Sequence, residues 1–336
     1  MAVNPLRLDP TRTTLLRRKF ENDLKRRFRK LKKLVWDLIV VEDAFGLRQD
    51  NSLNITVNTR WQFATDPQKQ KAFQKWFKEQ VDLGILEVPP GTDPLKPWTA
   101  TYTNSAYKSG VTRAYIASKA ALSESAAFSA GSKAQFLESA FGGPIGTKQL
   151  EMLATRSFEQ LRGITAAMGQ KINISLTNGL AHGHSPRKIA REMAKTIDGM
   201  TKQRAVVMAR TEIVHSYAEG QLDSLEQLGV EEVTAFVEWS TAGDDRVCPT
   251  CQPLEGVVMK LKEARGILPR HPQCRCAWIP VIDKPGKGRR NDLQKSINAS
   301  VKAERRKKRT TKEARDQSPW PGSDVAKPRR RSKVKA

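Results

Sequence analysis

All four cysteines of this 336-residue chain fall in one 29-residue window that also contains a histidine. The window begins with Cys248-Pro-Thr-Cys251 and ends with His271-Pro-Gln-Cys274-Arg-Cys276. A Cys-x2-Cys turn brings two thiolates to one point, and a Zn²⁺ ion takes four nitrogen or sulfur ligands in a tetrahedron. The spacing therefore predicts that this part of the chain folds around a zinc ion.

Five donors compete for the four positions of such a site. The favoured ligands are Cys248, Cys251, His271 and Cys274. Cys276 is the substitute for Cys274, because the two are expected to point to opposite faces of an extended segment. The alternatives to a metal site are free cysteines in a core and a disulfide formed after cell lysis. A filled set of four ligands leaves no open coordination position, so we expect a structural zinc site and not a catalytic one.

The charge of the chain is concentrated at its two ends. Of a net charge of +24, residues 1–33 carry +9 and residues 284–336 carry +14, whereas residues 34–283 carry +1. A neutral body with cationic arms indicates nucleic acid or an acidic partner, with a membrane surface as the other class. The start lacks the apolar core of a signal peptide, and the longest apolar stretch, 34–41, is too short to span a membrane. We therefore expect a soluble protein, made in the cytoplasm, with no membrane partner.

The C-terminal segment, 284–336, combines high charge with few apolar residues. Such a composition cannot bury enough surface to offset the entropy of ordering, so a mostly disordered basic tail is predicted. Its phosphate contacts with double-stranded DNA would be independent of sequence and sensitive to salt. The candidate nucleic-acid-binding residues are Arg305, Arg306, Lys307, Lys308, Arg309, Arg329, Arg330 and Arg331.

Residues 16–38 have the spacing of one long amphipathic helix. Asp9 is expected to cap this helix, and Pro10 to occupy its first position. Basic residues cover the other faces, which we interpret as the solvated side of a helix packed on a core. The apolar residues that follow one another at intervals of three or four are Leu16, Phe20, Leu24, Phe28, Leu31, Val35 and Leu38.

The sequence pattern of the rest of the chain predicts further helices followed by short strands. Helices are expected near 67–90, 105–140, 147–180, 186–199 and 202–228, and strands near 233–239, 257–261 and 277–282. The predicted fold is mainly α, with a small α+β C-terminal domain stapled by the Cys/His zinc site and a disordered basic tail. We expect a helical, basic N-terminal region over 1–145, the α+β domain over 146–283 and the tail over 284–336.

Several short motifs follow one another in order between residues 150 and 282. They are Ala209-Arg210-Thr211-Glu212 on a helix, Ala218-Glu219-Gly220, the run from Glu238 to Cys251, Glu255-Gly256, and the run from Pro269 to Cys276. This string resembles the conserved half of the phage Mu F-like head-morphogenesis proteins. The resemblance marks Arg210 and Glu212 as characteristic positions without assigning them a role.

The resemblance implies a minor head protein that is associated with the portal. Such a protein acts in procapsid assembly and in handling the packaged DNA. The implied partners are the phage portal protein, the major capsid and scaffold proteins, and double-stranded DNA bound without sequence preference. The implied location is the host cytoplasm during assembly, and then the capsid interior of the virion at the portal vertex.

We expect no enzymatic activity. The alternative is a zinc-containing phage nuclease or another DNA-acting enzyme, which would need histidines or carboxylates to activate water and to hold a cation. His271 is the only histidine in the cysteine region and is already assigned to zinc. Asp244 and Asp245 are typical of a turn. Glu212 and His215, three residues apart, are interpreted as contacts between helices.

Overall fold

The computed structural model describes residues 9–47, 66–88, 96–122, 132–228 and 236–281. The chain divides into a compact unit, Met1–Lys284, and a second unit, Pro285–Ala336. All the described residues belong to the first unit, so the basic tail lies outside them. The division of the first unit at residue 145 stays a prediction. No helix among the described residues has the length and apolar character needed to cross a bilayer.

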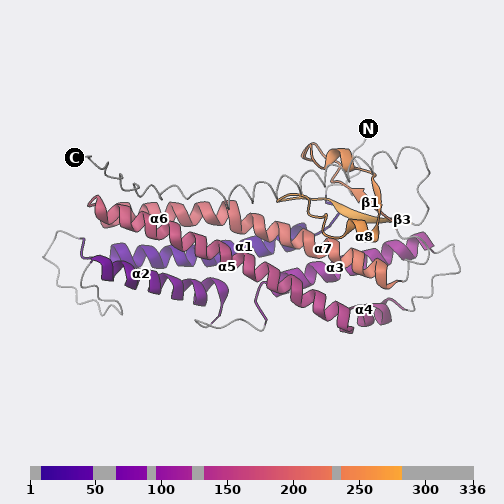
Figure 1. The fold of residues 1–336 in the computed structure, drawn as a ribbon, viewed down its shortest axis with the longest axis horizontal. Coiled ribbons are helices and arrows are strands. Elements are labelled where there is room, and N and C mark those ends of the chain that lie inside the picture. The colour runs from indigo at the N-terminus through magenta and orange to yellow at the C-terminus, as the bar shows by residue number, and fades with distance from the viewer. Residues whose placement is uncertain (1–8, 48–65, 89–95, 123–131, 229–235, 282–336) are drawn as a thin grey trace, which may run out of the picture. The chain divides into compact units, whose positions relative to one another are not determined.

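Helices dominate the described part of the chain (Figure 1), which confirms the prediction of a mainly α fold. Turns of π-helix at Asp37–Val41, Asp82–Leu86 and Thr201–Ala205 continue or interrupt the α-helices. The α-helices are α1 (Thr14–Trp36), α2 (Asp66–Val81), α3 (Ala100–Leu122), α4 (Lys133–Gly142), α5 (Pro144–Ala181), α6 (Pro186–Met200), α7 (Val206–Gln227) and α8 (Leu261–Ala264).

Helix α1 buries the apolar stripe that the sequence predicts. Phe20 and Leu24 are fully buried, and the stripe joins side chains of α2, α5 and α6 in one core cluster. The helix begins at Thr14, however, and not at Pro10. Residues 9–13 form a turn in which Arg12 has a φ of 52°. The carboxylate of Asp9 still accepts a hydrogen bond from the Thr14 N–H at 3.0 Å, so it satisfies a first-turn amide from outside the helix.

Helices α6 and α7 form one continuous rod, where the sequence predicts two separate helices. The π-turn Thr201–Ala205 joins them, and the residues at both junctions keep right-handed helical angles (Figure 1). A π-turn adds a residue to the helix and so rotates the apolar face that follows it. The rod therefore packs on α1 and α5 along α6 and on α3 along α7.

Helices α3 and α7 approach each other closely enough to require glycine. A Cβ atom on Gly220 would lie 2.3 Å from the Tyr107 carbonyl oxygen, and one on Gly110 would lie 2.1 Å from the Tyr217 carbonyl oxygen. Both distances are far below van der Waals contact, and in both cases the neighbour is backbone. This reciprocal pair of contacts fixes where the two helices cross.

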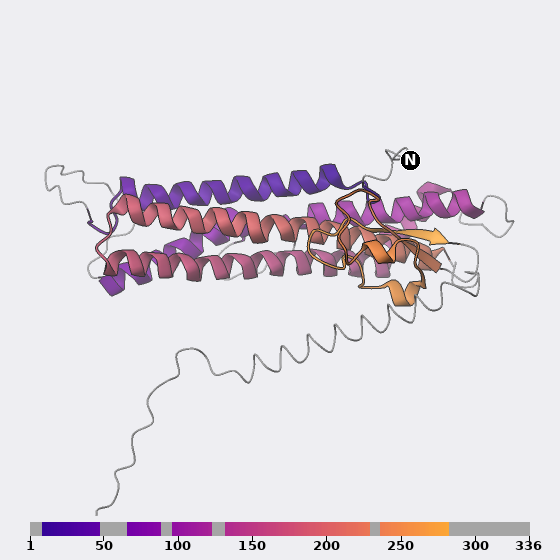
Figure 2. The same ribbon diagram turned by 90° about the horizontal axis from the view of Figure 1, so that it is seen from above.

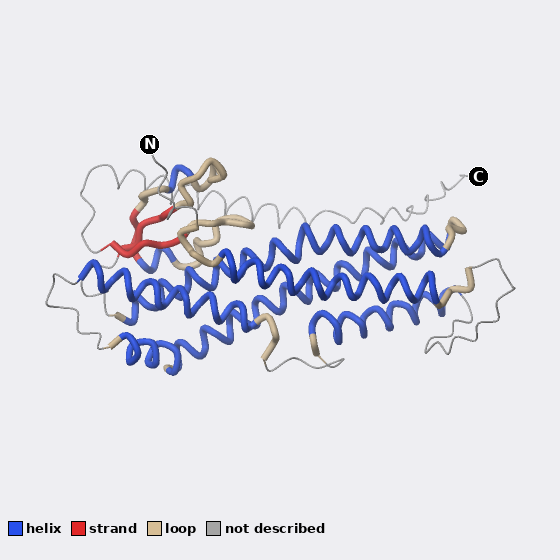
Figure 3. Tube along the Cα trace, turned by 180° about the vertical axis from the view of Figure 1, so that it is seen from behind, coloured by secondary structure: helices blue, strands red, loops and turns tan. Residues whose placement is uncertain are grey.

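A small antiparallel sheet follows the helices (Figure 3), as predicted. Its order is β2 (Val258–Lys260), β1 (Phe236–Ser240), β3 (Ala277–Val281), with Trp239 paired opposite Trp278. The sheet is fastened to α7 by Gln221. The Gln221 side chain donates to the Trp278 carbonyl at 2.7 Å and accepts from the Trp278 N–H at 3.2 Å. The loops that leave this sheet carry the cysteines.

Candidate metal centre

Two loops bring the four cysteines and the histidine together. The ligand atoms of Cys248, Cys251 and His271 lie within 4.8 Å of one another, and those of Cys251, Cys274 and Cys276 form a second group of the same size. Cys251 belongs to both groups, so all five predicted donors form one connected cluster. All four cysteines are free thiols.

The first loop is shaped by hydrogen bonds within the Cys-x2-Cys turn. The Cys251 N–H donates to the Cys248 carbonyl at 3.0 Å, and it lies 3.3 Å from the Cys248 Sγ. A short 3-10 turn, Gln252–Leu254, returns the chain to the sheet, where the Gly256 N–H donates to the Trp239 carbonyl at 2.9 Å. The turn thus presents both sulfurs on the side that faces the second loop.

The second loop carries the remaining three donors. His271 Nδ1 lies 2.8 Å from the Pro272 carbonyl, which makes Nδ1 the protonated nitrogen. Nε2 is then free to act as an acceptor or ligand, and it lies 3.0 Å from the Cys248 Sγ. The Cys274 N–H donates to the His271 carbonyl at 3.2 Å and closes the turn. Each loop therefore supplies at least two donors, as a metal site between two segments requires.

Cys274 and Cys276 point to the same place, so the expectation that they face opposite ways is wrong. Residues two apart on an extended segment share a face. Both are buried, as is Cys251. Hydrogen bonding among the three sulfurs lowers the pKa of the Cys274 thiol well below its usual range and raises the pKa of the Cys251 thiol. This is the pattern of one thiolate stabilised by neighbouring thiols, a cluster in which a cation would favour further ionisation.

The donor set fits a zinc ion. Zn–S bonds of about 2.3 Å in a tetrahedron place ligand atoms roughly 3.8 Å apart. Within each group of three donors the atoms already lie within 4.8 Å of one another, and a four-ligand site has to draw on both groups. Five donors exceed four positions, so one of them is left over, and Cys251 is the donor common to both groups.

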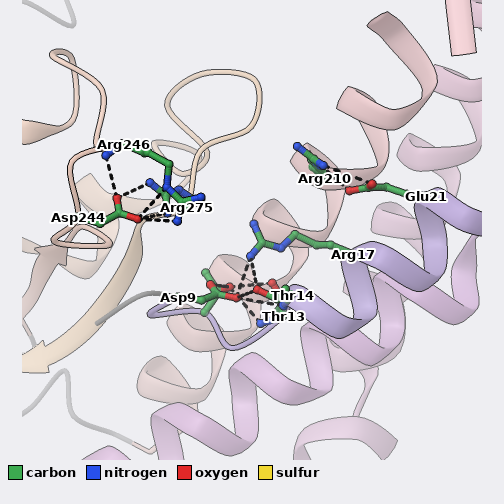
Figure 4. A network of polar contacts seen from close by, with 10 residues as sticks. Asp9, Thr13, Thr14, Arg17, Glu21, Arg210, Asp244, Arg246 and Arg275 are labelled. Atoms are coloured by element: carbon green, nitrogen blue, oxygen red, sulfur yellow. Dashed lines mark hydrogen bonds and ion pairs between the residues drawn. The ribbon is translucent and has the colours of Figure 1, made fainter. Parts of the chain in front are cut away.

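An ion pair joins the two loops beside the cysteines (Figure 4). The guanidinium of Arg275 donates to both carboxylate oxygens of Asp244, at 2.6 and 2.7 Å, and Arg246 donates to the same carboxylate at 2.9 Å. Hydrogen bonds from Arg275 above all hold the pKa of Asp244 well below its usual range. Asp244 also accepts from the Arg246 N–H, as its predicted place in a turn implies, while Asp245 is exposed. Sequence reasoning missed the partner Arg275.

The motif residues Arg210 and Thr211 connect α7 to the second loop and to α1. Arg210 forms an ion pair with the buried Glu21 of α1 (Figure 4), and its Nη1 donates to the Gln273 side chain at 2.8 Å. The Thr211 hydroxyl lies 3.4 Å from the Gln273 N–H. Gln273 has a φ of 65° and sits between His271 and Cys274. These contacts give Arg210 a positioning role for the loop that carries the donors.

Glu212, the other motif residue, is fully buried and faces α5. Its carboxylate accepts hydrogen bonds from Arg156 Nε at 3.1 and 3.3 Å. His215 Nδ1 lies 3.2 Å from the Leu268 carbonyl in the segment that precedes the second loop. The interpretation as a contact between helices holds for Glu212, whereas the partner of His215 lies in a loop. The tail residues predicted to bind nucleic acid lie outside the described residues.

Substituting Glu212→Gln is expected to destabilise the protein by about 2 kcal/mol, because the buried side chain keeps its shape but loses its charge-assisted bonds to Arg156. Urea unfolding followed by circular dichroism measures the change. The matched control is Glu159→Gln on α5, which removes an ion pair whose partners, Glu159 and Arg162, are half-exposed. That change should be within about 0.5 kcal/mol of zero. Equal effects of the two substitutions would contradict a special role for Glu212.

Residues 170–279 match the family model described as "Phage Mu protein F like protein". The matched range contains the α6–α7 rod, the Arg210–Glu212 motif and both loops of the Cys/His cluster. Comparison with curated proteins and with solved structures found no match. Through this region, the chain is similar to the phage Mu F-like proteins.

Proposed function

We propose that this chain is a minor head protein that is incorporated at the portal vertex during assembly of the phage head and that contacts the packaged DNA. The observation that carries the proposal is the family match over residues 170–279, because the family indicates a phage head-morphogenesis protein of the virion. Its partners would be the portal protein, the capsid and scaffold proteins, and double-stranded DNA, which the basic tail would contact through phosphates.

In this function the Cys/His cluster is a structural zinc site. Cys251 would hold the ion together with three of the other four donors, and an ion with four protein ligands has no position left for a substrate. Its contribution would be folding energy, since it joins the loop after β1 to the loop before β3. A rigid sheet region, fastened to α7 through Gln221 and Gln273, would give the neighbouring head proteins a fixed surface to dock on.

We also propose that the role is not enzymatic. The polar groups beside the cluster already have partners: Asp244 binds Arg275 and Arg246, and Glu212 binds Arg156. A general acid or base must be free to exchange a proton with substrate or water, which a carboxylate held in such pairs is not. The nuclease alternative gains no support from the arrangement of these described residues.

The test is the recovery of partners from a phage-infected lysate. Tagged protein is purified after nuclease treatment, its partners are identified by mass spectrometry, and the metal content of the purified chain is measured. The expected result is portal and capsid protein, with about one zinc per chain. A tagged basic protein of similar net charge is the control for recovery through residual nucleic acid. Host nucleic-acid-binding proteins without portal protein would refute the proposed function.

A further inference from the structure

The solvent-facing side of α1 has a single sign of charge. Its exposed charged residues are all basic, from Arg18 and Lys19 near its start to Lys30 and Lys33 near its end. Neither acidic residue of the helix is fully exposed. Glu21 is buried against Arg210, and Asp23 accepts a hydrogen bond from Tyr102 of α3 at 2.7 Å. Lys25 and Arg26 form ion pairs with Glu21 and Asp23, and the other five exposed cations of α1 form no ion pair among the described residues.

Helix α6 repeats this arrangement. Arg187, Lys188, Arg191 and Lys195 are exposed along its length, and Lys202 and Arg204 are exposed on the π-turn that follows. The exposed acid of α6, Asp198, is bonded through both oxygens to Lys32 of α1 at 2.9 Å. That ion pair lies between the two helices, and the other carboxylate of α6, Glu192, is half-buried.

Packing places these two basic surfaces next to each other. Helices α1 and α6 are in contact, and Figure 2 shows them side by side along most of their length. Their apolar sides, including Phe28 of α1 and Met193 of α6, belong to one core cluster, so both basic sides face solvent. We call the exposed basic residues of α1, α6 and the π-turn the α1–α6 face.

The α1–α6 face is not explained by stability. Lys25 and Arg29, and then Arg29 and Lys33, are four residues apart on α1, and Arg187, Arg191 and Lys195 repeat this spacing on α6. Like charges four residues apart on a helix repel each other and destabilise it. A solvated helix surface ordinarily mixes both signs. Repeated repulsion along two adjacent helices indicates a surface whose charge is balanced by a partner.

We propose that the α1–α6 face binds the phosphate backbone of double-stranded DNA. The 23 residues of α1 span about 34 Å, which is roughly one turn of the double helix. Cations spread over such a length match a polyanion with regularly spaced charges. The proposal rests on the proposed function only in its choice of DNA as that polyanion, and it places DNA contacts on the helical body in addition to the tail.

The other partners of basic helices fit this face less well. A membrane-surface helix inserts its apolar side into lipid, but the apolar side of α1 is buried in the protein core. Binding of single strands uses aromatic side chains on which bases stack. The exposed residues of α1 and α6 include no aromatic side chain. What remains is contact with phosphates, which does not depend on sequence.

The test measures binding of the full-length chain to two unrelated duplexes of about 30 base pairs over a salt series. The face variant replaces six exposed cations by glutamine, which keeps helix propensity: Arg18→Gln, Arg29→Gln, Lys33→Gln, Arg187→Gln, Arg191→Gln and Lys195→Gln. The matched control removes the same charge from other described surfaces: Lys71→Gln, Lys119→Gln, Lys133→Gln, Lys148→Gln, Lys171→Gln and Lys262→Gln. A third variant replaces the eight candidate tail residues by glutamine.

At low salt the face variant is expected to bind both duplexes at least about tenfold more weakly than the control variant. The negative slope of log affinity against log salt concentration should be smaller in magnitude by about 3 to 5. Adding the face substitutions to the tail variant should weaken its DNA binding by the same factor, because the α1–α6 face and the tail are different sets of cations. Unfolding midpoints of the face and control variants establish that each is folded.

Equal binding by the face and control variants would overturn the proposal, since charge alone would then explain the affinity. Unchanged DNA binding together with lost recovery of an acidic head protein would also overturn it, and would assign the face to that protein. Failure of the proposed function is a different result. It would appear as the absence of portal protein from the lysate experiment, whatever the DNA measurements give.

Discussion

Replacing Gly220 by alanine is expected to destabilise the protein by about 3 kcal/mol or more. The new methyl group would lie 2.3 Å from the carbonyl oxygen of Tyr107 and 3.0 Å from its carbonyl carbon. Backbone of a packed helix cannot move aside as the tip of a flexible side chain can. Helix α3 would therefore have to separate from α7 along their crossing, which loosens the packing of Tyr107 and Tyr217, both buried there. Thermal and urea unfolding of the variant measure the loss.

The matched control is Gly163→Ala on α5. Gly163 is a helical glycine that is exposed, and a Cβ atom there would have no heavy atom within 4 Å. The same added methyl should stabilise the protein by roughly 0.5 to 1 kcal/mol through helix propensity alone. Opposite signs for the two substitutions are the expected result. If Gly220→Ala also stabilised the chain, the close approach of α3 and α7 would be wrong.

The helices and strands could largely be predicted from the sequence, because their signals are local. The stripe from Phe20 to Val35 and the short apolar run 277–281 depend on neighbours within a few residues. The continuity of α6 and α7 could not be predicted in this way. Nothing local distinguishes a π-turn at Thr201–Ala205 from a break, since the rotation it introduces is recognised only by the helices that pack on either side of it.

In the candidate site, the metal donors could be predicted from the sequence and their supporting contacts could not. Its donors were found from the spacing of cysteines and histidine, and the structure brings all five together. Its supporting contacts were not found, because they join residues distant in sequence: Arg275 to Asp244, and Arg210 to Gln273. No sequence pattern around Arg275 indicates which distant carboxylate it binds. The family resemblance marked Arg210, and only the fold shows that Arg210 contacts the loop that carries the donors.

The α1–α6 face could not be predicted from the charge of the sequence either. The sequence shows a basic N-terminal segment and a body, 34–283, whose charges nearly cancel. The net charge of a segment does not show which of its acidic and basic side chains are buried and which are exposed after folding. Carboxylates such as Glu21 and Glu212 are buried in ion pairs, while the lysines and arginines of α6 stay exposed beside those of α1. Residues 34–283, although almost neutral in sum, can therefore contribute exposed cations to a basic surface.

Replacing Cys251 by serine is expected to abolish metal binding and to lower the melting temperature by about 10 °C. Cys251 is the donor shared by both groups, and it is buried. Structural zinc sites contribute folding energy directly, so losing the ion should cost several kcal/mol. The remaining donors would also be left as crowded thiols next to a new hydroxyl. Zinc per chain, by elemental analysis, and thermal unfolding are the two measurements.

A chelator separates loss of the metal from loss of packing. Added to the native protein, it should lower the melting temperature nearly as far as the substitution does, and it should have little further effect on Cys251→Ser. Native protein that melts unchanged with chelator, or that contains no zinc when prepared with zinc present, would contradict the metal site. The cysteines would then be ordinary core residues.

The other donors provide the control within the same cluster. Five donors compete for four positions. When His271, Cys274 or Cys276 is substituted, the donor left over can therefore take the place of the lost ligand, whereas no other donor belongs to both groups as Cys251 does. We therefore expect at least one of His271→Ala and Cys276→Ser to keep about one zinc per chain and most of the stability. Equal and complete loss of zinc in all of these variants would mean that the ion needs every donor, and the shared position of Cys251 would then have no special consequence.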